Sequence, residues 1–365
     1  MEQVRKMFLG GNTGYGFYSF YEQVVNGEQA ATYILKGGPG TGKSYFMRWI
    51  AERMLALGYG LEEFYCSSDS NSLDGLHIPA LGVALIDGTA PHMVDPKHPG
   101  AVEFIINLGD YWDESGLRRQ GSAIQAAVAR KGFLFRRAYG YLHLARSLND
   151  EIEAHMRELG ALDYVGLNRA ADGIIEELLG NAPSRDIPAR ERHLFASAIT
   201  PQGIVNHLPN ITSNIQRRVL LKGEPGTGRT TIVQKVYQAV RQKGYGVEVY
   251  HCALDPQRID HVLIPVLGIA ICNASEPHSC PARLSDIVID TAHYVDSHKL
   301  NPYVDDIRRL QDMYQRALDT AIELIGRAKE AHDYLESLYV PFMDFEQVTK
   351  RQEQVLQQIL TLAER

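Results

Sequence analysis

The sequence predicts an α/β protein made of two tandem units, each with a parallel sheet, covering helices and a helical hairpin. Three observations predict this class. The chain repeats itself, each copy runs strand, glycine-rich loop, helix and strand, and each copy ends in a long helical pattern of small apolar residues. The 365 residues are 45% hydrophobic and 22% charged, which is ordinary for a globular chain long enough for two domains.

The repeat is visible when the sequence is shifted by 186 positions. Lys36 to His92 then aligns without a gap on Lys222 to His278, and 20 of the 57 positions are identical. Upstream, "FLGGNTGYG" is echoed by "FASAITPQG", so the repeat begins near the first residue. The polar, Pro- and Arg-containing stretch before the second copy reads as a linker. We therefore predict a first unit at 1–180, a linker at 181–193 and a second unit at 194–365.

The elements of each unit follow in the same order. The runs "TYILKG" and "RRVLLKG" predict a buried strand, and the glycine loop after each opens a helix of about four turns. These helices end near Gly58 and Gly244, where glycine suits a C-cap. "EEFYCSS" and "VEVYHCA" predict a second strand, and "LGVALIDG" and "LGIAICNA" a third. Strand, helix and strand with apolar central strands indicate a parallel sheet covered by helices.

A helical arm follows the sheet in each unit. In the second unit a heptad-like seam rich in alanine ends before Pro341, and it comprises Leu310, Tyr314, Ala317, Ala321, Leu324, Ala328, Ala331, Leu335 and Leu338. The first unit continues the rhythm at Ala138, Tyr141, Ala145, Leu148, Ile152 and Leu159. "ADGIIEELLG" and "FEQVTKRQEQVLQQILTLAE" predict return helices. Each arm is either a hairpin packed on its own unit or a projection that binds a protein partner.

The first glycine loop has the spacing of a phosphate-binding site. Gly37, four residues, then Gly42, Lys43 and Ser44 fit the pattern G-x-x-x-x-G-K-[ST] between a strand and a helix. Glycines permit close backbone approach, and the loop N–H groups with the helix N-terminus point at an anion. Nucleotide contacts are therefore expected at Gly37, Gly38, Pro39, Gly40, Thr41, Gly42, Lys43, Ser44 and Tyr45.

Two further residues in this unit predict a Mg²⁺ site. The Ser44 hydroxyl would bind the ion directly, and Asp87, which closes the apolar run "VALID", would supply a carboxylate beside it. The alternative for Asp87 is a turn-forming role before Gly88. Lys43 would contact the β- and γ-phosphates.

These motifs resemble those of the P-loop NTPase superfamily, with a Walker A sequence at Gly37 to Ser44 and a Walker B strand ending at Asp87. The resemblance covers the core of both units and not the arms. It implies binding of ATP and Mg²⁺. Helicases and AAA+ ATPases usually have Glu after the Walker B Asp, whereas this chain has Gly88, and no guanine-specific motif is present. The tandem layout is similar to uncharacterised bacterial proteins described as ATPases or nucleotide kinase-like.

The second loop keeps the glycines but changes two charged positions. Arg229 replaces Lys43 and Asn273 replaces Asp87, while Thr230 matches Ser44. Arginine does not deliver the same point contact as an ammonium, and Asn lacks the carboxylate charge. We expect the second site to have lost efficient hydrolysis. It either binds a phosphate group through its backbone or is a structural copy, and the residues in question are Gly223, Glu224, Pro225, Gly226, Thr227, Gly228, Arg229, Thr230 and Thr231.

Other candidates carry two interpretations each. Asp69 and Asp74 follow the second strand, and both recur in the second copy. Asp69 would orient an acceptor hydroxyl, activate water or cap a loop. His92 also recurs and would sense the γ-phosphate, shuttle a proton or fix a turn. Cys66 is expected to be a buried thiol. The arginines 118, 119, 136 and 137 would form a solvated face, or one of them would clamp the transferring phosphoryl group. Tyr15, Phe17 and Tyr18 would be core residues or would stack on a base.

Composition limits the function classes. A net charge of −7 and a pI near 6.0 give no clear nucleic-acid signal, and four cysteines without a CxxC pair predict free thiols in a reducing cytosol. No apolar run approaches the roughly 20 residues of a membrane span, so we expect a cytoplasmic protein. Three hypotheses follow: an ATPase with hydrolysis in the first unit, a nucleotide or small-molecule kinase with Asp69 placing the acceptor, and a nucleotide-controlled interaction protein. The oligomeric state is left open.

Overall fold

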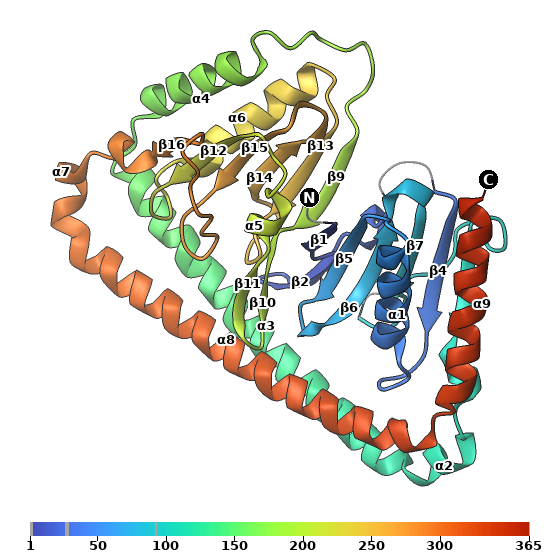
Figure 1. Ribbon diagram of the computed structural model, residues 1–365. Helices are drawn as coiled ribbons and strands as arrows, with labels where there is room; N and C mark the ends of the chain where they lie inside the picture. Colours follow the sequence, from blue (N-terminus) through green and yellow to red (C-terminus); the bar gives the residue numbers. More distant parts are fainter. Residues whose placement is uncertain (1–2, 26–28, 92, 365) are drawn as a thin grey trace.

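The computed structural model describes residues 3–25, 29–91 and 93–364, and contains two six-stranded sheets with helices on their outer faces (Figure 1). The first sheet has the order β1-β5-β6-β7-β4-β8. Its strands are β1 Val4–Met7, β4 Ala31–Lys36, β5 Leu61–Cys66, β6 Asp69–Ile78, β7 Val83–Asp87 and β8 Glu103–Asn107. Helix α1, Lys43–Ala56, follows the first glycine loop as expected.

The first sheet is mostly parallel, which corrects the all-parallel sheet that the sequence predicted. Strand β6 runs antiparallel to both of its neighbours, β5 and β7. Its sequence, DSNSLDGLHI, opens with residues of low strand propensity, which is why the sequence pattern predicts no strand there. A two-residue turn after Cys66 folds β6 back on β5, and burial of its second half then stabilises the strand.

The second sheet repeats the first, with the order β9-β13-β14-β15-β12-β16 and β14 as its antiparallel strand. Its elements are β9 Glu191–Phe195, β12 Arg217–Lys222, helix α6 Arg229–Gln242, β13 Val247–His251, β14 Ile259–Ile264, β15 Ile269–Asn273 and β16 Ile287–Asp290. The upstream echo becomes two equivalent hairpins, β2 Gly10–Thr13 with β3 Gly16–Ser19, and β10 Ser197–Thr200 with β11 Gly203–Asn206. Phe8 and Phe195 exchange backbone hydrogen bonds of 3.0 Å, which joins the two copies at equivalent residues.

The two sheets pack face to face. One core contains inward residues of both, among them Ile34 and Phe64 of the first sheet and Leu220 and Tyr250 of the second. The alternation along β4 explains this, since Ile34 faces that shared core while Tyr33 and Leu35 face the core under α1. The result is a four-layered body with helices outside and two sheets inside.

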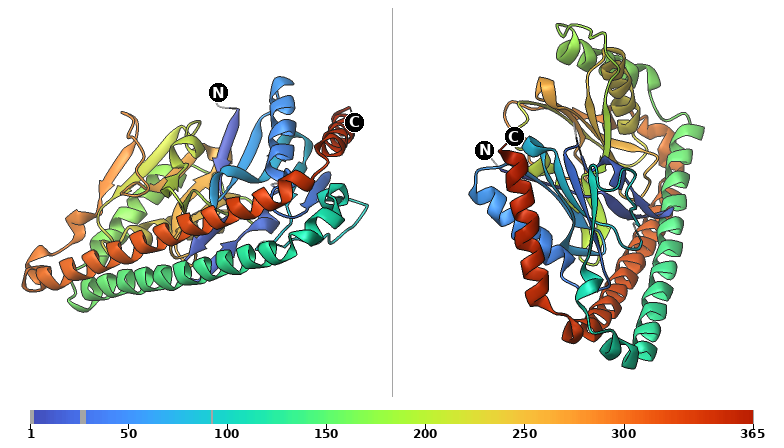
Figure 2. Two further views of the ribbon diagram at one scale, coloured as in Figure 1. Left: turned by 90° about the horizontal axis from the view of Figure 1, so that it is seen from below. Right: turned by 90° about the vertical axis from the view of Figure 1, so that its right-hand side faces the viewer.

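Two long helices run side by side and antiparallel beneath both sheets (Figures 1 and 2). They are α3, Gly121–Glu158, and α8, Val304–Tyr339, and short helices α2 Glu114–Arg119 and α7 Ser297–Leu300 precede them. Ala138 and Ala145 of the first predicted seam pack with Ala317 and Ala321 of the second. Leu142 and Ile325, which the predicted seams did not include, complete this contact. The seam prediction is confirmed, and helix α8 ends before Pro341 as expected.

The return helices cross between the copies, which corrects the expectation of a hairpin packed on its own unit. Helix α4, Tyr164–Leu179, buries Leu167, Ala171 and Ile174 against α6 and the second sheet. Helix α9, Phe345–Ala363, buries Val348, Val355 and Ile359 against α1 and the first sheet. Each unit of sequence therefore completes the helical layer of the other.

Two remaining sequence predictions concern the cysteines and the membrane. All four cysteines are free, with Cys272 and Cys280 buried, as expected. Within the described ranges, none of the helices combines the length and the apolar character that a membrane crossing requires.

Candidate functional site

We call the loop between β4 and α1, Gly37 to Ser44, the first loop. Its backbone is tightly turned. Gly37, Gly40 and Gly42 have φ values of 149°, 71° and 88°, in the left-handed region that favours glycine. Lys43 folds back over the loop, and its Nζ donates to the carbonyl oxygens of Gly37 at 3.1 Å and Gly38 at 2.9 Å. The Lys43 ammonium thus lies against the backbone of its own loop.

The two residues expected to hold Mg²⁺ lie at this same edge of the sheet. Strand β7 ends at Asp87, whose Oδ2 is 3.7 Å from Lys43 Nζ. Its Oδ1 also accepts from the N–H of Thr89 at 2.9 Å, so Asp87 shapes the following turn as well. The Ser44 hydroxyl oxygen accepts a hydrogen bond of 2.9 Å from the N–H of Leu73 in β6. A carboxylate, a hydroxyl and an ammonium are the groups that a Mg²⁺–phosphate site would need here.

The other acidic candidates separate in space. Asp69 is the first residue of β6 and pairs with Cys66, the last residue of β5, at the edge where β4 and β7 also end. Its Oδ2 lies 3.3 Å from Lys329 Nζ of α8. The sequence analysis placed Asp74 after the end of the second strand, and the structure does not. Asp74 lies inside β6, is 5% exposed, and faces the protein interior. His92 lies outside the described residues.

The far end of helix α8 covers the first loop, which sequence reasoning missed. The N–H of Gly40 donates to Oε1 of Glu336 at 3.2 Å. A Cβ on Gly40 would lie 3.0 Å from the Glu336 carbonyl oxygen, and one on Gly38 would lie 3.0 Å from the Tyr339 ring. Periodicity places Lys329, His332 and Glu336 on one helical face, but no pattern in the sequence shows that this face meets the other copy's loop.

The charge on Glu336 is stabilised from several sides. Oε1 lies 3.5 Å from Nε2 of His332, and that hydrogen bond lowers the pKa of Glu336 below its ordinary value. The Gly40 N–H and the Lys329 charge act in the same direction, and together with His332 they outweigh the opposing effect of burial. A carboxylate anion is therefore held against the donors of the first loop.

The loop between β12 and α6, Gly223 to Thr230, which we call the second loop, has a different polar network. Arg229 donates to Oδ1 of Asn273, so the two residues that stand in place of Lys43 and Asp87 bind each other. Nδ2 of Asn273 donates to Oδ1 of the buried Asp260 at 3.4 Å, and Oδ2 of Asp260 lies 3.3 Å from Nε2 of His278. Burial favours a raised pKa for Asp260, but His278 first, then His261 and Arg229, lower it below its ordinary value.

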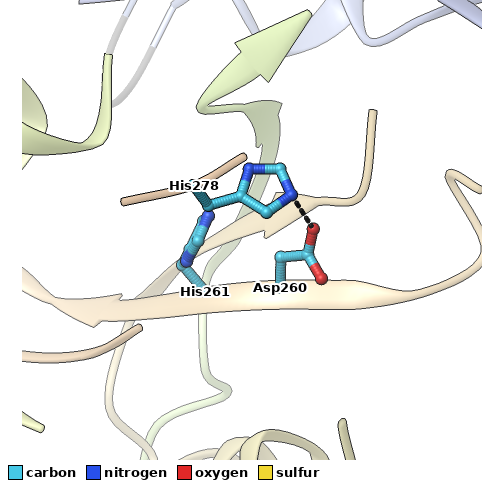
Figure 3. A group of neighbouring side chains, drawn as sticks. All are labelled: Asp260, His261 and His278. Carbon is cyan, nitrogen blue, oxygen red and sulfur yellow. Dashed lines mark ion pairs between the residues drawn. The ribbon is translucent and has the colours of Figure 1, made fainter. Parts of the chain in front are cut away.

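Asp260, His261 and His278 form a buried group whose ligand-type atoms lie within 4.8 Å of one another (Figure 3). Two imidazoles and a carboxylate are ligands that Zn²⁺ uses. However, Oδ1 of Asp260 already accepts a hydrogen bond from Asn273, and the Arg229 charge beside the group opposes a dication. We interpret this group as a network that fixes the second loop.

Helix α3 covers the second loop as α8 covers the first, but its acidic side chain has a different partner. A Cβ on Gly226 would lie 3.4 Å from Cα of Glu153 in α3, the counterpart of Glu336. Here the carboxylate is bound by Arg258, which also binds Asp150 at 2.5 Å. The acidic side chain therefore pairs with arginine beside the second loop, whereas at the first loop it accepts from a loop N–H.

The remaining candidates have structural surroundings. Tyr15 lies against the guanidinium of Arg146 at 4.1 Å, whereas Phe17 and Tyr18 pack on core residues. Burial raises the pKa of the Cys66 thiol, which keeps it neutral. Tyr45 is 64% exposed on the first turn of α1. The four arginines 118, 119, 136 and 137 are exposed, as expected for a solvated face.

Comparison of the chain with protein-family models, curated proteins and solved structures found no match.

Proposed function

We propose that the protein is a tandem P-loop NTPase that binds ATP with Mg²⁺ at the first loop and hydrolyses it there. In this assignment the loop N–H groups and Lys43 bind the β- and γ-phosphates, and Ser44 and Asp87 hold Mg²⁺. The observation that carries the proposal is the strand–loop–helix at Gly37 to Ser44, with three left-handed glycines and Lys43 Nζ 3.7 Å from the Asp87 carboxylate.

The second loop is assigned a structural or regulatory role. Its glycine backbone is retained, with Gly223, Gly226 and Gly228 also at positive φ. The Arg229 side chain, however, is engaged by Asn273 and its pKa is lowered by burial, so it is not directed at a ligand as Lys43 would be. Phosphate contacts there would depend on backbone N–H groups alone.

Phosphate release from Mg·ATP tests this assignment. Lys43→Ala is expected to lower the rate by roughly 100-fold, because it removes the cation that stabilises charge on the phosphoryl group. Arg229→Ala, the matched control at the equivalent position, is expected to stay within about threefold of the unchanged protein. Equal losses in both variants, or full activity in Lys43→Ala, would contradict hydrolysis at the first loop.

A phosphotransferase is the second candidate, because Asp69 lies at the same sheet edge as the first loop. There it would orient an acceptor hydroxyl toward the γ-phosphate. This candidate predicts that ATP is consumed only when a nucleotide or small-molecule acceptor is added. Phosphate release without an acceptor would favour the ATPase.

A further inference from the structure

We propose that the phosphate site of the first loop is composite: helix α3 supplies Lys131 as a second cation for the terminal phosphate, and helix α8 supplies Glu336 as an anion that the phosphate displaces. This rests on the proposed function, because it assigns new residues to the same site. It also extends it, because the site would then be coupled to the pair of long helices.

Glu336 occupies a position that a phosphate oxygen requires. Its Oε1 accepts from the N–H of Gly40 at 3.2 Å, in the middle of the glycine loop. The N–H groups of such a loop are the donors that bind phosphate oxygens. A carboxylate at this N–H prevents the same hydrogen bond to phosphate and repels the negative charge of a triphosphate. Binding of a nucleotide therefore requires Glu336 to withdraw.

Lys131 is connected to this position through one histidine. Lys131 Nζ donates to Nδ1 of His332 at 3.4 Å, and Nε2 of the same ring lies 3.5 Å from Glu336 Oε1. The two helices are antiparallel (Figures 1 and 2), and Lys131 of the first copy and Glu336 of the second both contact the His332 ring.

Lys131 is a cation poorly compensated by its surroundings. It is half-buried, and among the residues that the structure describes it makes no ion pair with a carboxylate within 4.0 Å. Burial lowers its pKa, and the neighbouring Lys43 charge lowers it further. Two ammonium groups near one glycine loop gain stability when an anion arrives, so a terminal phosphate is the ligand that this arrangement favours.

The second loop supplies an internal comparison. There the equivalent carboxylate, Glu153, is bound by Arg258 and its loop does not depend on it for a hydrogen bond. A displaceable anion therefore belongs to the loop with the intact lysine.

Calorimetric titration with Mg·ADP and with a non-hydrolysable Mg·ATP analogue tests the inference. Glu336→Gln removes the charge and keeps the size, and is expected to tighten binding of the analogue about tenfold, the value of one charge-assisted hydrogen bond. Lys131→Ala is expected to weaken the analogue about tenfold and to leave Mg·ADP within about twofold. Glu330→Gln is the matched control, since it makes the same change on an exposed position of the same helix.

The outcomes separate this inference from the proposed function. A gain in affinity in Glu336→Gln cannot result from misfolding, so it supports displacement directly. Unchanged or weaker binding in Glu336→Gln, or equal effects of Lys131→Ala on both nucleotides, overturns the composite site while wild-type binding stands. Absence of binding in every protein, wild type included, overturns the proposed function and the composite site together.

Discussion

Replacing Glu62 by glutamine is expected to lower the free energy of unfolding by roughly 3–5 kcal/mol, the range for breaking a buried ion pair. The Glu62 side chain is almost fully buried between the sheets and accepts hydrogen bonds of 2.8 and 3.0 Å from Arg192. Arg5 donates to it at 3.0 Å, and Arg5 also binds Glu248, the repeat counterpart of Glu62. Glutamine would remove the charge that binds Arg192 most closely, and the Glu248 carboxylate, 3.7 Å from Arg192 Nη1, would compensate it only in part.

Urea unfolding measures this effect, with Glu114→Gln as the control. Glu114 pairs with Arg118 on the exposed surface at 3.5 Å, and its replacement is expected to change stability by less than about 0.5 kcal/mol. A loss below about 1 kcal/mol in Glu62→Gln would show that the buried cluster does not join the two sheets as described.

The same carboxylate gives stability a pH dependence. Burial by itself would raise the pKa of Glu62, but the Arg192 charge, the hydrogen bond from His77 and the Arg5 charge hold it far below the ordinary value. The folded-state pKa therefore lies below the unfolded-state value of about 4.3. The stabilisation is fully present above about pH 5 and is lost as pH falls toward the folded-state pKa. The difference between wild type and Glu62→Gln is accordingly expected to shrink below about pH 4.

Replacing Ile359 of α9 by alanine is expected to destabilise the first sheet by roughly 2–5 kcal/mol. Ile359 is fully buried in the core with α1, although it belongs to the second copy of the sequence. Ile174→Ala in α4 is the matched variant, because that residue is buried against α6 and the second sheet.

Amide hydrogen exchange distinguishes crossed from uncrossed helices. Ile359→Ala is expected to raise exchange in α1 and β4 more than in α6 and β12, and Ile174→Ala to do the reverse. The opposite assignment, with each variant loosening the sheet of its own copy, would contradict the crossing.

The sequence predicted the individual strands, loops and helices better than it predicted which elements pack against one another. The apolar runs gave β4, β5 and β7, the glycine spacing gave the first loop, and the alanine seam gave two long helices that pack closely. Each of these rests on a pattern that short-range physics imposes. The sequence did not predict the antiparallel strand β6, because Asp69, Ser70 and Asn71 have low strand propensity. The strand is stabilised by pairing with neighbouring strands on both sides.

Sequence patterns could not predict that the return helices cross between the two copies, and the reason is geometric. A helix of 36 residues, such as α8, is about 54 Å long and runs beneath both sheets (Figure 1). The C-terminal end of α8 therefore lies at the first copy, where the return helix α9 packs into the core with α1. Periodicity shows which face of α9 is buried and not which sheet buries it. For the same reason Glu336 and Lys131 had no signal linking them to the first loop.

Isothermal titration calorimetry of the intact protein with ATP and Mg²⁺ tests the central claim most directly. We expect one binding site per chain, lost in Lys43→Ala and retained in Arg229→Ala. No heat with any purine triphosphate, or binding that survives Lys43→Ala unchanged, would contradict it.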